Sequence, residues 1–133
     1  MEMADAKGNQ NILVFIAGFG GQRLQYQPGQ CERKWIGHIE TGQASYYADR
    51  HVDRHTASGE LYKAGERTAA HRTLPFGSMV RVTNIKSGKR VVVRINDRGP
   101  FVRGRIIDLS RVAFESIGRA SEGLLQVQIE VIR

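Results

Sequence analysis

Residues 91–101 read VVVRINDRGPF, and this stretch decides how the rest of the chain is interpreted. The β-branched run at 91–95 is typical of a strand, and Gly99-Pro100 marks a turn directly after it. Asp97 follows the apolar run, between an Asn and an Arg, so its carboxylate is held at a fixed place on a loop edge. Taken alone, such an Asp is best explained as an acceptor for turn N–H groups.

Further short strands flank this stretch. Segments 79–83 and 125–131 alternate apolar and polar residues, which is the period of a strand. Segments 79–83 and 91–95 are joined by the turn KSGK, which predicts a hairpin. Several short strands favour a small closed barrel, because closure removes exposed sheet edges. The predicted strands are residues 43–47, 79–83, 91–95, 105–109 and 125–131.

One short helix interrupts the strands. Ser110 is suited to cap its start, and Gly118 is suited to end it. Residues 68–71 and 74–77 are interpreted as loops or strand ends, with Pro75 limiting regular pairing.

The bulk properties indicate one basic domain. The chain has 133 residues, which is enough for a single hydrophobic core. A single cysteine, Cys31, excludes an internal disulfide framework and a cysteine-based zinc site. The net charge is +7, and the excess lies in residues 42–133, with 16 Lys/Arg against 9 Asp/Glu. Such charge favours nucleic acid, anionic lipid or an acidic wall polymer as partner, although it can also simply keep a domain soluble.

Residues 1–40 are interpreted as a leader and linker before a folded domain at 41–133. Segment 12–21 is apolar but too short to cross a bilayer, which takes about 20 residues, and its length suits the core of an export signal. The flanks fit poorly, because two acids and only one Lys precede it. Three interpretations stay open: a degenerate export signal, a lipid anchor at Cys31 that would attach the protein to a membrane, and a poorly ordered leader. Residues 18–30, rich in Gly and Gln, read as linker.

Several ordered motifs resemble those of the rare lipoprotein A family of bacteria. The resemblance covers about residues 42–132. It implies an all-β fold, a six-stranded double-psi β-barrel with one or two short helices, which is shared with plant expansins and barwin-like proteins. The matching segments are GQASYY at 42–47, TASGE at 56–60, TAAHRTLPFG at 68–77, VVVRINDRGPF at 91–101 and RIIDLS at 105–110.

The resemblance also has two departures. Residues 49–55, DRHVDRH, are more charged than the Gly-containing, aromatic-rich segment usual in the family, which bears on the shape of one groove wall. The septal peptidoglycan-binding module of longer members does not follow residue 133, so targeting by that module is not expected.

The resemblance implies an endolytic peptidoglycan lytic transglycosylase of the bacterial cell envelope, in the periplasm or at the outer membrane. Such enzymes cut glycan strands, preferably stripped of peptides, to anhydro-muramyl ends during wall remodelling and daughter-cell separation. The 6-hydroxyl of the muramic acid attacks, so one group can serve as acid and then as base. A carboxylic acid in a partly desolvated cleft can donate the proton.

The resemblance matches four ionisable residues to the catalytic site of the family. Asp97 is expected to be the general acid/base, because its turn presents it at a strand end. Asp108 is expected to be the second carboxylate, as a stabiliser or as the acid instead. Glu60 and His71 are expected to hydrogen-bond the site or the sugar and to bias its pKa values. Each also has a structural explanation: Asp108 as a partner of the helix start, Glu60 as an exposed turn residue and His71 as a buried structural histidine.

Four more residues are candidates for substrate binding. Tyr46 and Tyr47 have rings that can stack on sugars, although single aromatic residues more often pack in the core. Arg72 and Arg98 belong to a group with Arg94, Arg103 and Arg105 that follows the site motifs and could hold wall carboxylates.

Other functions stay open or are disfavoured. The main alternative is a non-catalytic peptidoglycan or polysaccharide-binding module of the expansin type. A specific nucleic-acid partner is not expected, since only the charge supports one. His51, His55 and His71 do not form a convincing zinc set, so no metal or other cofactor is expected. A monomer is expected.

Overall fold

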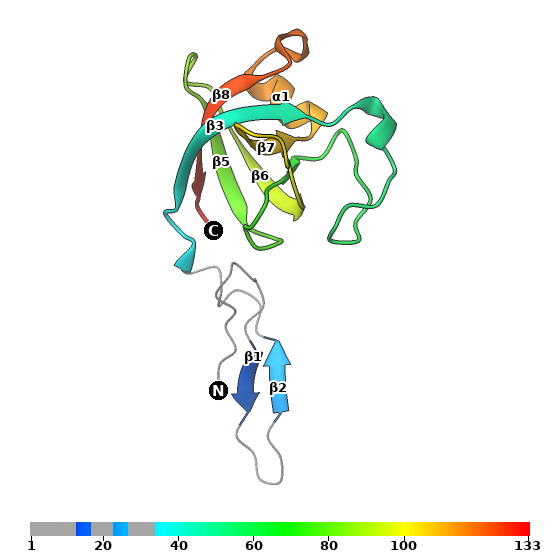
Figure 1. Ribbon diagram of the computed structural model, residues 1–133, viewed down its shortest axis with the longest axis vertical. Helices are drawn as coiled ribbons and strands as arrows, with labels where there is room; N and C mark the ends of the chain where they lie inside the picture. Colours follow the sequence, from blue (N-terminus) through cyan, green and yellow to red (C-terminus); the bar gives the residue numbers. More distant parts are fainter. Residues whose placement is uncertain (1–12, 17–22, 27–33) are drawn as a thin grey trace.

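The computed structural model describes residues 13–16, 23–26 and 34–133. Six strands close into one barrel (Figure 1), in the order β3-β7-β4-β6-β5-β8. This confirms the small closed barrel that the strand patterns predicted and the six strands that the family resemblance implied. The barrel strands are β3 (Ile39–Tyr46), β4 (Thr68–Ala70), β5 (Met79–Asn84), β6 (Arg90–Asp97), β7 (Arg105–Leu109) and β8 (Leu125–Val131).

Two further strands lie in the region predicted as leader and linker. β1 (Leu13–Ile16) falls in the apolar segment and pairs antiparallel with β2 (Arg23–Tyr26), which falls in the predicted linker. Cys31, the candidate lipid-attachment residue, lies outside the described residues, as does most of the predicted leader. Within the described ranges, no helix has the length and apolar character needed to cross a bilayer.

The predicted hairpin is formed by β5 and β6. These strands pair antiparallel, with Val80 opposite Val93 and Val82 opposite Val91, and all four side chains are buried. β8 alternates buried and more exposed residues along its whole length, as its sequence pattern predicted. Because side chains alternate between the two faces of a strand, this patterning gives the barrel an apolar interior.

β4 is a strand where the sequence predicted only a loop or a strand end. Its three residues are all buried, so it shows no alternation. It lies between β6, to which it runs parallel, and β7, to which it runs antiparallel. β3 also begins earlier than predicted, at Ile39 instead of residue 43.

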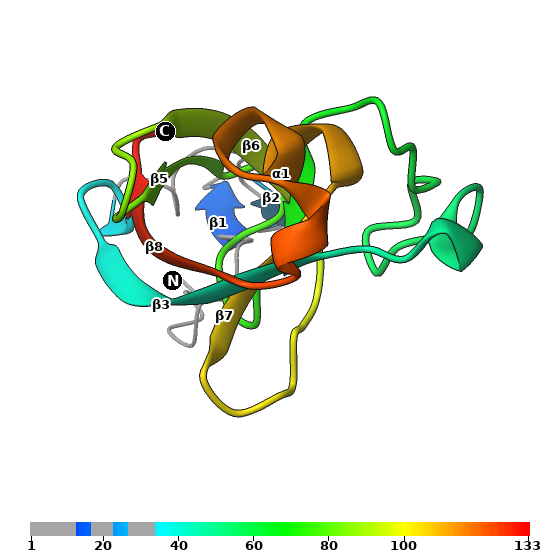
Figure 2. The ribbon, with the colours of Figure 1, turned by 90° about the horizontal axis from the view of Figure 1, so that it is seen from above.

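One α-helix, α1 (Arg111–Ile117), is present in the described part of the chain, and it lies against the barrel near β6 (Figure 2). As predicted, it begins after Ser110 and ends at Gly118. The Ser110 hydroxyl makes no capping bond, and instead accepts the N–H of Thr68 at 3.4 Å. Phe114 and Ile117 are buried in the core, where each contributes on the order of 2 kcal/mol. The short 3-10 helices are η2 (Asp49–His51) and η3 (Ala120–Glu122).

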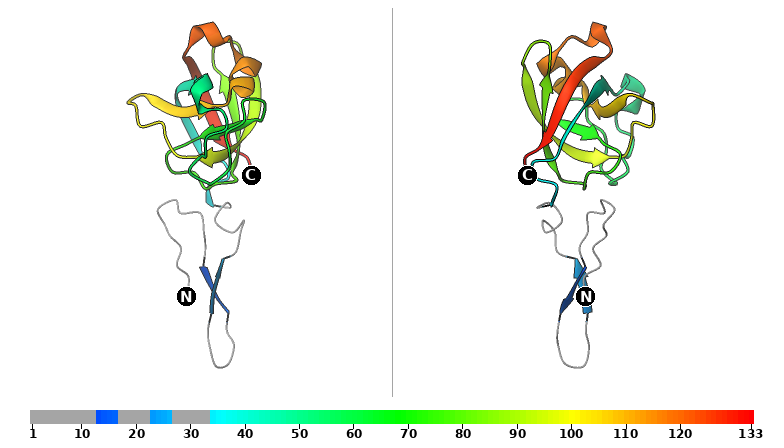
Figure 3. Two further views of the ribbon diagram at one scale, coloured as in Figure 1. Left: turned by 90° about the vertical axis from the view of Figure 1, so that its right-hand side faces the viewer. Right: turned by 60° about the vertical axis from the view of Figure 1, so that its left-hand side comes forward.

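β3 and β7 approach each other closely at Gly42. A Cβ atom there would lie 2.7 Å from Cγ2 of Ile106, so the crossing requires a glycine. Directly after it the pairing shifts register, because Gln43 is opposite Arg105 but Ala44 is opposite Ile107. The extra residue is a bulge. Two long connections, residues 47–67 and 98–104, project from the barrel wall in different directions (Figure 3).

Candidate active site

Four strands each contribute one residue to a row across the outer face of the barrel. Ser45 of β3 is opposite Asp108 of β7, and Ala70 of β4 is opposite both Asp108 and Asp97 of β6. Residues opposite each other on neighbouring strands point to the same face. Two strand spacings place the Cα atoms of the two aspartates about 10 Å apart. Barrel closure therefore brings the two predicted carboxylates together, with a small side chain between them.

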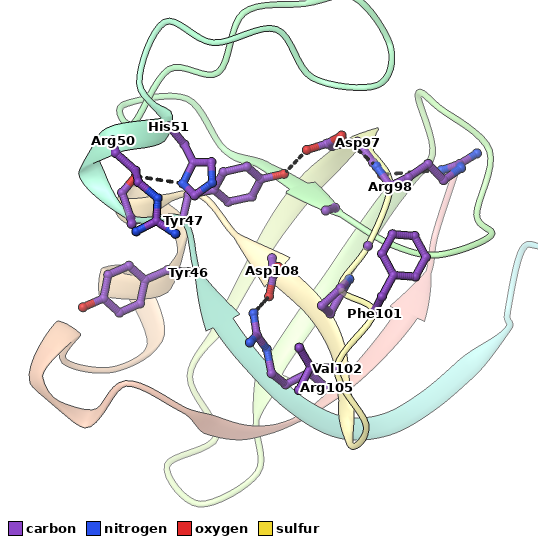
Figure 4. A pocket seen from close by; sticks show the side chains of 14 residues that line it. Tyr46, Tyr47, Arg50, His51, Asp97, Arg98, Phe101, Val102, Arg105 and Asp108 are labelled. Carbon is purple, nitrogen blue, oxygen red and sulfur yellow. Dashed lines mark hydrogen bonds and ion pairs between the residues drawn. The ribbon is translucent and has the colours of Figure 1, made fainter.

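An open cavity of about 380 Å³ lies over this row. Asp97, Asp108 and Ala70 all line it, and the two aspartates come from neighbouring parts of its wall (Figure 4). A second hollow of about 570 Å³ adjoins it. The two adjacent hollows, together called the groove, share three lining residues: Tyr46, Ala48 and Arg105.

The carboxylate of Asp97 accepts three hydrogen bonds. Oδ1 accepts the backbone N–H groups of Ala57 at 2.8 Å and of Arg98 at 2.9 Å. Oδ2 accepts the hydroxyl of Tyr47 at 2.6 Å. The role of turn acceptor that the sequence suggested for Asp97 thus describes Oδ1, whereas Oδ2 accepts from a side chain that follows β3.

Asp108 is held by a different set of partners. Its Oδ1 accepts the hydroxyl of Ser45 at 2.5 Å and Nη2 of Arg105 at 2.7 Å. Nη2 of Arg105 also lies 2.6 Å from the Ser45 oxygen, so the three side chains form a closed triangle. Asp108 therefore pairs with strand residues and not with the start of α1, the structural role that its position in the sequence suggested.

Glu60 lies outside the cavity and fastens a loop to β6. Its carboxylate accepts hydrogen bonds from both Nη atoms of Arg94, at 2.7 and 2.8 Å, and from Nδ2 of Asn96 at 3.2 Å. The Arg94 guanidinium lowers the pKa of Glu60. The backbone oxygen of Glu60 accepts the N–H of Thr56 at 2.7 Å. This turn presents the Ala57 N–H to Asp97, so Glu60 acts on the site through the loop.

His71 is buried behind the site, with 2% of its surface exposed. Its Nδ1 accepts the N–H groups of Thr73 and Leu74, both at 3.1 Å, so we assign the ring proton to Nε2, which donates to Glu40 at 3.0 Å. This bond is the main reason why the pKa of Glu40 falls from 4.5 to about 2. The backbone N–H of His71 donates to the oxygen of Asp97 at 3.2 Å. The ring of His71 therefore contacts Glu40, and its backbone supports Asp97.

Three of the four predicted substrate-binding residues line the cavity: Tyr46, Tyr47 and Arg98. Tyr46 packs at 4.7 Å on Phe114, and one face of Tyr47 is stacked at 4.4 Å on Tyr62. Both tyrosines thus make structural contacts as well.

The two arginines behave differently from each other. Arg98 stacks over the Phe76 ring at 4.0 Å, and burial lowers its pKa. Arg72 does not line either hollow, because its Nη1 donates to the oxygens of Pro100 and Arg105 at 3.2 and 2.9 Å. Arg72 therefore ties together the two ends of the connection 98–104.

Other groove residues were not predicted from the sequence to bind substrate. Arg50 and His51 of η2 line the cavity, and Phe101, 79% exposed, lies on its opposite rim. Phe101 ends the stretch 91–101, so its position directly after the Gly-Pro turn was a signal available in the sequence. In the described part of the chain, no cluster of three or more His, Cys, Asp or Glu side chains is arranged to hold a metal ion.

Comparison with known proteins agrees with this architecture. Residues 39–129 match the family model described as lytic transglycolase. The protein named endolytic peptidoglycan transglycosylase RlpA from Pasteurella multocida is 48% identical over 104 residues, covering 78% of this chain and 35% of that protein. The protein of the same name from Neisseria meningitidis serogroup A is 52% identical over 93 residues, covering 70% of this chain and 39% of that protein. The chain thus spans 35–39% of the length of these relatives.

Two solved structures share the fold. Streptomyces papain inhibitor superposes with a TM-score of 0.61 at 24% identity, covering 74% of this chain and 97% of that one. An expansin mutant from Clavibacter michiganensis, in complex with cellohexaose, gives a TM-score of 0.57 at 20% identity, covering 71% of this chain and 50% of that one. At these identities the likeness concerns the fold alone. The family match over most of the barrel and the curated relatives near 50% identity carry the assignment: the chain belongs to the lytic transglycolase family of double-psi β-barrel domains.

Proposed function

We propose that this domain is an endolytic peptidoglycan lytic transglycosylase that prefers peptide-stripped glycan. The observation that carries the proposal is the row that places Asp97 and Asp108 on one face, under one open groove. The names of the relatives support the same reaction.

Asp97 is the proposed general acid and base. It gives a proton to the glycosidic oxygen as the bond from that oxygen to C1 of the muramic acid breaks. It then takes the proton of the 6-hydroxyl of the same sugar, whose oxygen forms the new bond to C1. The carboxyl group ends as it began, and no water is consumed. Asp108, held by Ser45 and Arg105, is proposed to stabilise the positive charge that develops on the sugar ring.

The groove supports an internal cut in a long polymer. The cavity and the second hollow adjoin, because Tyr46, Ala48 and Arg105 line both, so the groove is longer than the cavity alone. The exposed ring of Phe101 offers an apolar face to a sugar. Arg50 and Arg98 line the cavity, and neither forms an ion pair within the described residues. We propose that they receive the lactyl carboxylates that peptide removal exposes.

The remaining candidates are proposed to position the site. Glu60 holds the loop that reaches Oδ1 of Asp97, His71 supports the end of β6, and Arg72 ties the connection 98–104. The proposal also places the protein in the periplasm or at the outer membrane, as a monomer with a folded domain at 41–133 after a leader that provides any membrane attachment. Fractionation, the mass of the mature N-terminus and size-exclusion chromatography test these points.

The function is tested with purified protein and peptide-stripped glycan strands, with products identified by mass spectrometry. We expect anhydro-muramyl ends from the wild type and none from Asp97→Asn. Asp53→Asn is the matched control, since Asp53 forms only an exposed pair with Lys63. Reducing ends in place of anhydro ends would identify a hydrolase. Wall binding without any product would identify a non-catalytic module of the expansin type, and both results contradict the proposal.

A further inference from the structure

We infer that Tyr47 is a positioning residue for the general acid: its hydroxyl stabilises the Asp97 carboxylate as the glycosidic bond breaks, and its ring does not serve as a sugar platform. The inference rests on the proposed function, because it assigns a role within that reaction.

The two oxygens of Asp97 have unequal surroundings. Oδ1 already accepts two backbone N–H groups, from Ala57 and Arg98, and both are fixed by the fold. Oδ2 accepts one bond, from the Tyr47 hydroxyl at 2.6 Å. Oδ2 therefore keeps a free lone pair and is the oxygen that can exchange a proton with the substrate. The Tyr47 hydroxyl is the group that hydrogen-bonds this oxygen.

Tyr47 is held rigidly in this position. Its backbone N–H donates to the oxygen of Leu109 at 3.1 Å. Its ring lies flat on Tyr62, with centroids 4.4 Å apart and planes 11° apart, and forms a T-shaped pair with the ring of His51, with centroids 5.5 Å apart. Tyr62 is 2% exposed, and its hydroxyl accepts the N–H of Arg111 at 3.1 Å. With one face covered by a buried residue, the ring cannot turn to stack on a sugar without breaking these contacts.

The hydroxyl acts on the rate because the charge of Asp97 changes during the reaction. A hydrogen bond to a carboxylate is roughly twice as strong as one to a neutral acid. When Asp97 gives up its proton, the Tyr47 bond strengthens, and an interaction that is stronger in the transition state than in the ground state raises kcat. Tyr47 stays a donor throughout, since burial and the bond to Asp97 raise its pKa far above the usual value.

Other charged and titratable groups also surround this pair and remain unchanged when only the Tyr47 hydroxyl is removed. Asp108 and Arg105 face it from β7, Tyr62 from the connection 47–67, and Arg98 from the end of β6. Arg50 and His51 face it from η2.

The test compares Tyr47→Phe with the wild type on peptide-stripped glycan. We expect kcat to fall about tenfold with KM little changed. Activity that needs protonated Asp97 is lost as the pH rises. Removing a hydrogen-bond donor makes the carboxylate less stable, so the protonated acid persists to higher pH. The limb on which activity falls with rising pH should therefore move to higher pH in Tyr47→Phe. The matched control is Tyr62→Phe, which removes a hydroxyl from the same stacked pair but none from Asp97, so it should leave this limb in place.

A second measurement does not depend on turnover. The titration of the Asp97 carboxyl carbon, followed by NMR, should move to higher pH in Tyr47→Phe and stay in place in Tyr62→Phe. If the wild type makes no anhydro ends, the proposed function fails, while this titration still reports on the Tyr47 contact. The inference would be overturned if Tyr47→Phe left kcat, the falling limb of the pH–activity profile and the NMR titration all unchanged. A raised KM with unchanged kcat would also overturn it, because the ring would then be binding sugar.

Discussion

Replacing Glu40 with Gln should destabilise the barrel strongly at neutral pH and hardly at all in acid. Oε2 of Glu40 accepts hydrogen bonds from Nε2 of buried His71 at 3.0 Å and from Nε2 of His38 at 2.7 Å. The side chain of Glu40 is 24% exposed, so solvent screens these bonds only in part. They hold the pKa of Glu40 near 2 instead of 4.5, with the His71 bond as the largest cause.

The size and the sign both follow from that lowered pKa. Each pKa unit corresponds to about 1.4 kcal/mol, so ionised Glu40 contributes about 3 kcal/mol to the free energy of unfolding. A lowered pKa means that this contribution is complete above pH 4.5 and is lost as the pH falls toward 2. Gln resembles the protonated acid, so Glu40→Gln should lack the contribution at every pH. The gap between the two proteins should therefore close on acidification.

The assay is urea unfolding at pH 7, 4 and 2, followed by far-UV circular dichroism and by the fluorescence of Trp35, the single tryptophan, which packs against the core. Glu130→Gln is the control. Glu130 is 35% exposed and pairs with Arg81 on the surface, so its loss should cost less than about 1 kcal/mol. A Glu40→Gln gap below about 1 kcal/mol at pH 7, or a gap that persists at pH 2, would refute the reasoning.

Three further substitutions test the groove. Ala70→Leu should abolish product formation by filling the space between the two aspartates, at a cost of about 1–3 kcal/mol in unfolding free energy; unchanged kcat/KM would contradict the row of residues described for β4. Phe101→Ala should raise KM severalfold and leave kcat and the melting temperature in place, since the ring is 79% exposed; an unchanged KM would remove it from the binding surface. Glu60→Gln should lower kcat about tenfold by loosening the loop that carries the Ala57 N–H; activity equal to the wild type would show that this loop holds without the Arg94 pair.

The strands with alternating patterns were predictable from the sequence. Segment 125–131 matches β8 to the residue, because one face of the strand meets the core and the other is more exposed. Segment 105–109 also matches β7 to the residue, although the burial of β7 does not alternate, since the bulge at Ile106 interrupts the pairing. β4 was not predictable in this way, because it is buried on both sides and has only three residues. Its neighbours, β6 and β7, are far from it along the chain, and local patterning carries no information on that pairing.

The candidate site was predictable in part. Motif resemblance identified Asp97 and Asp108, and the structure places both in the groove. The partnership of Arg105 with Asp108 was hidden, because residues three apart on a regular strand point to opposite faces. The bulge at Ile106 restores them to one face, and that bulge depends on pairing with β3. The contact between Glu40 and His71 joins residues 31 positions apart, and no local signal marks it.

The pairing of β3 determines when, during synthesis and folding, the candidate site can assemble. β3 is the first barrel strand along the chain, yet it pairs with β8, which is the last. The ring of strands therefore cannot shut until β8 is available, and contacts so distant in sequence are slow to form. Ser45 reaches its aspartate only through β3, and Tyr47 is anchored beside it. A nascent or truncated polypeptide that lacks β8 thus holds every side chain of the candidate site without the fold that aligns them, so the site cannot assemble before β8 is made.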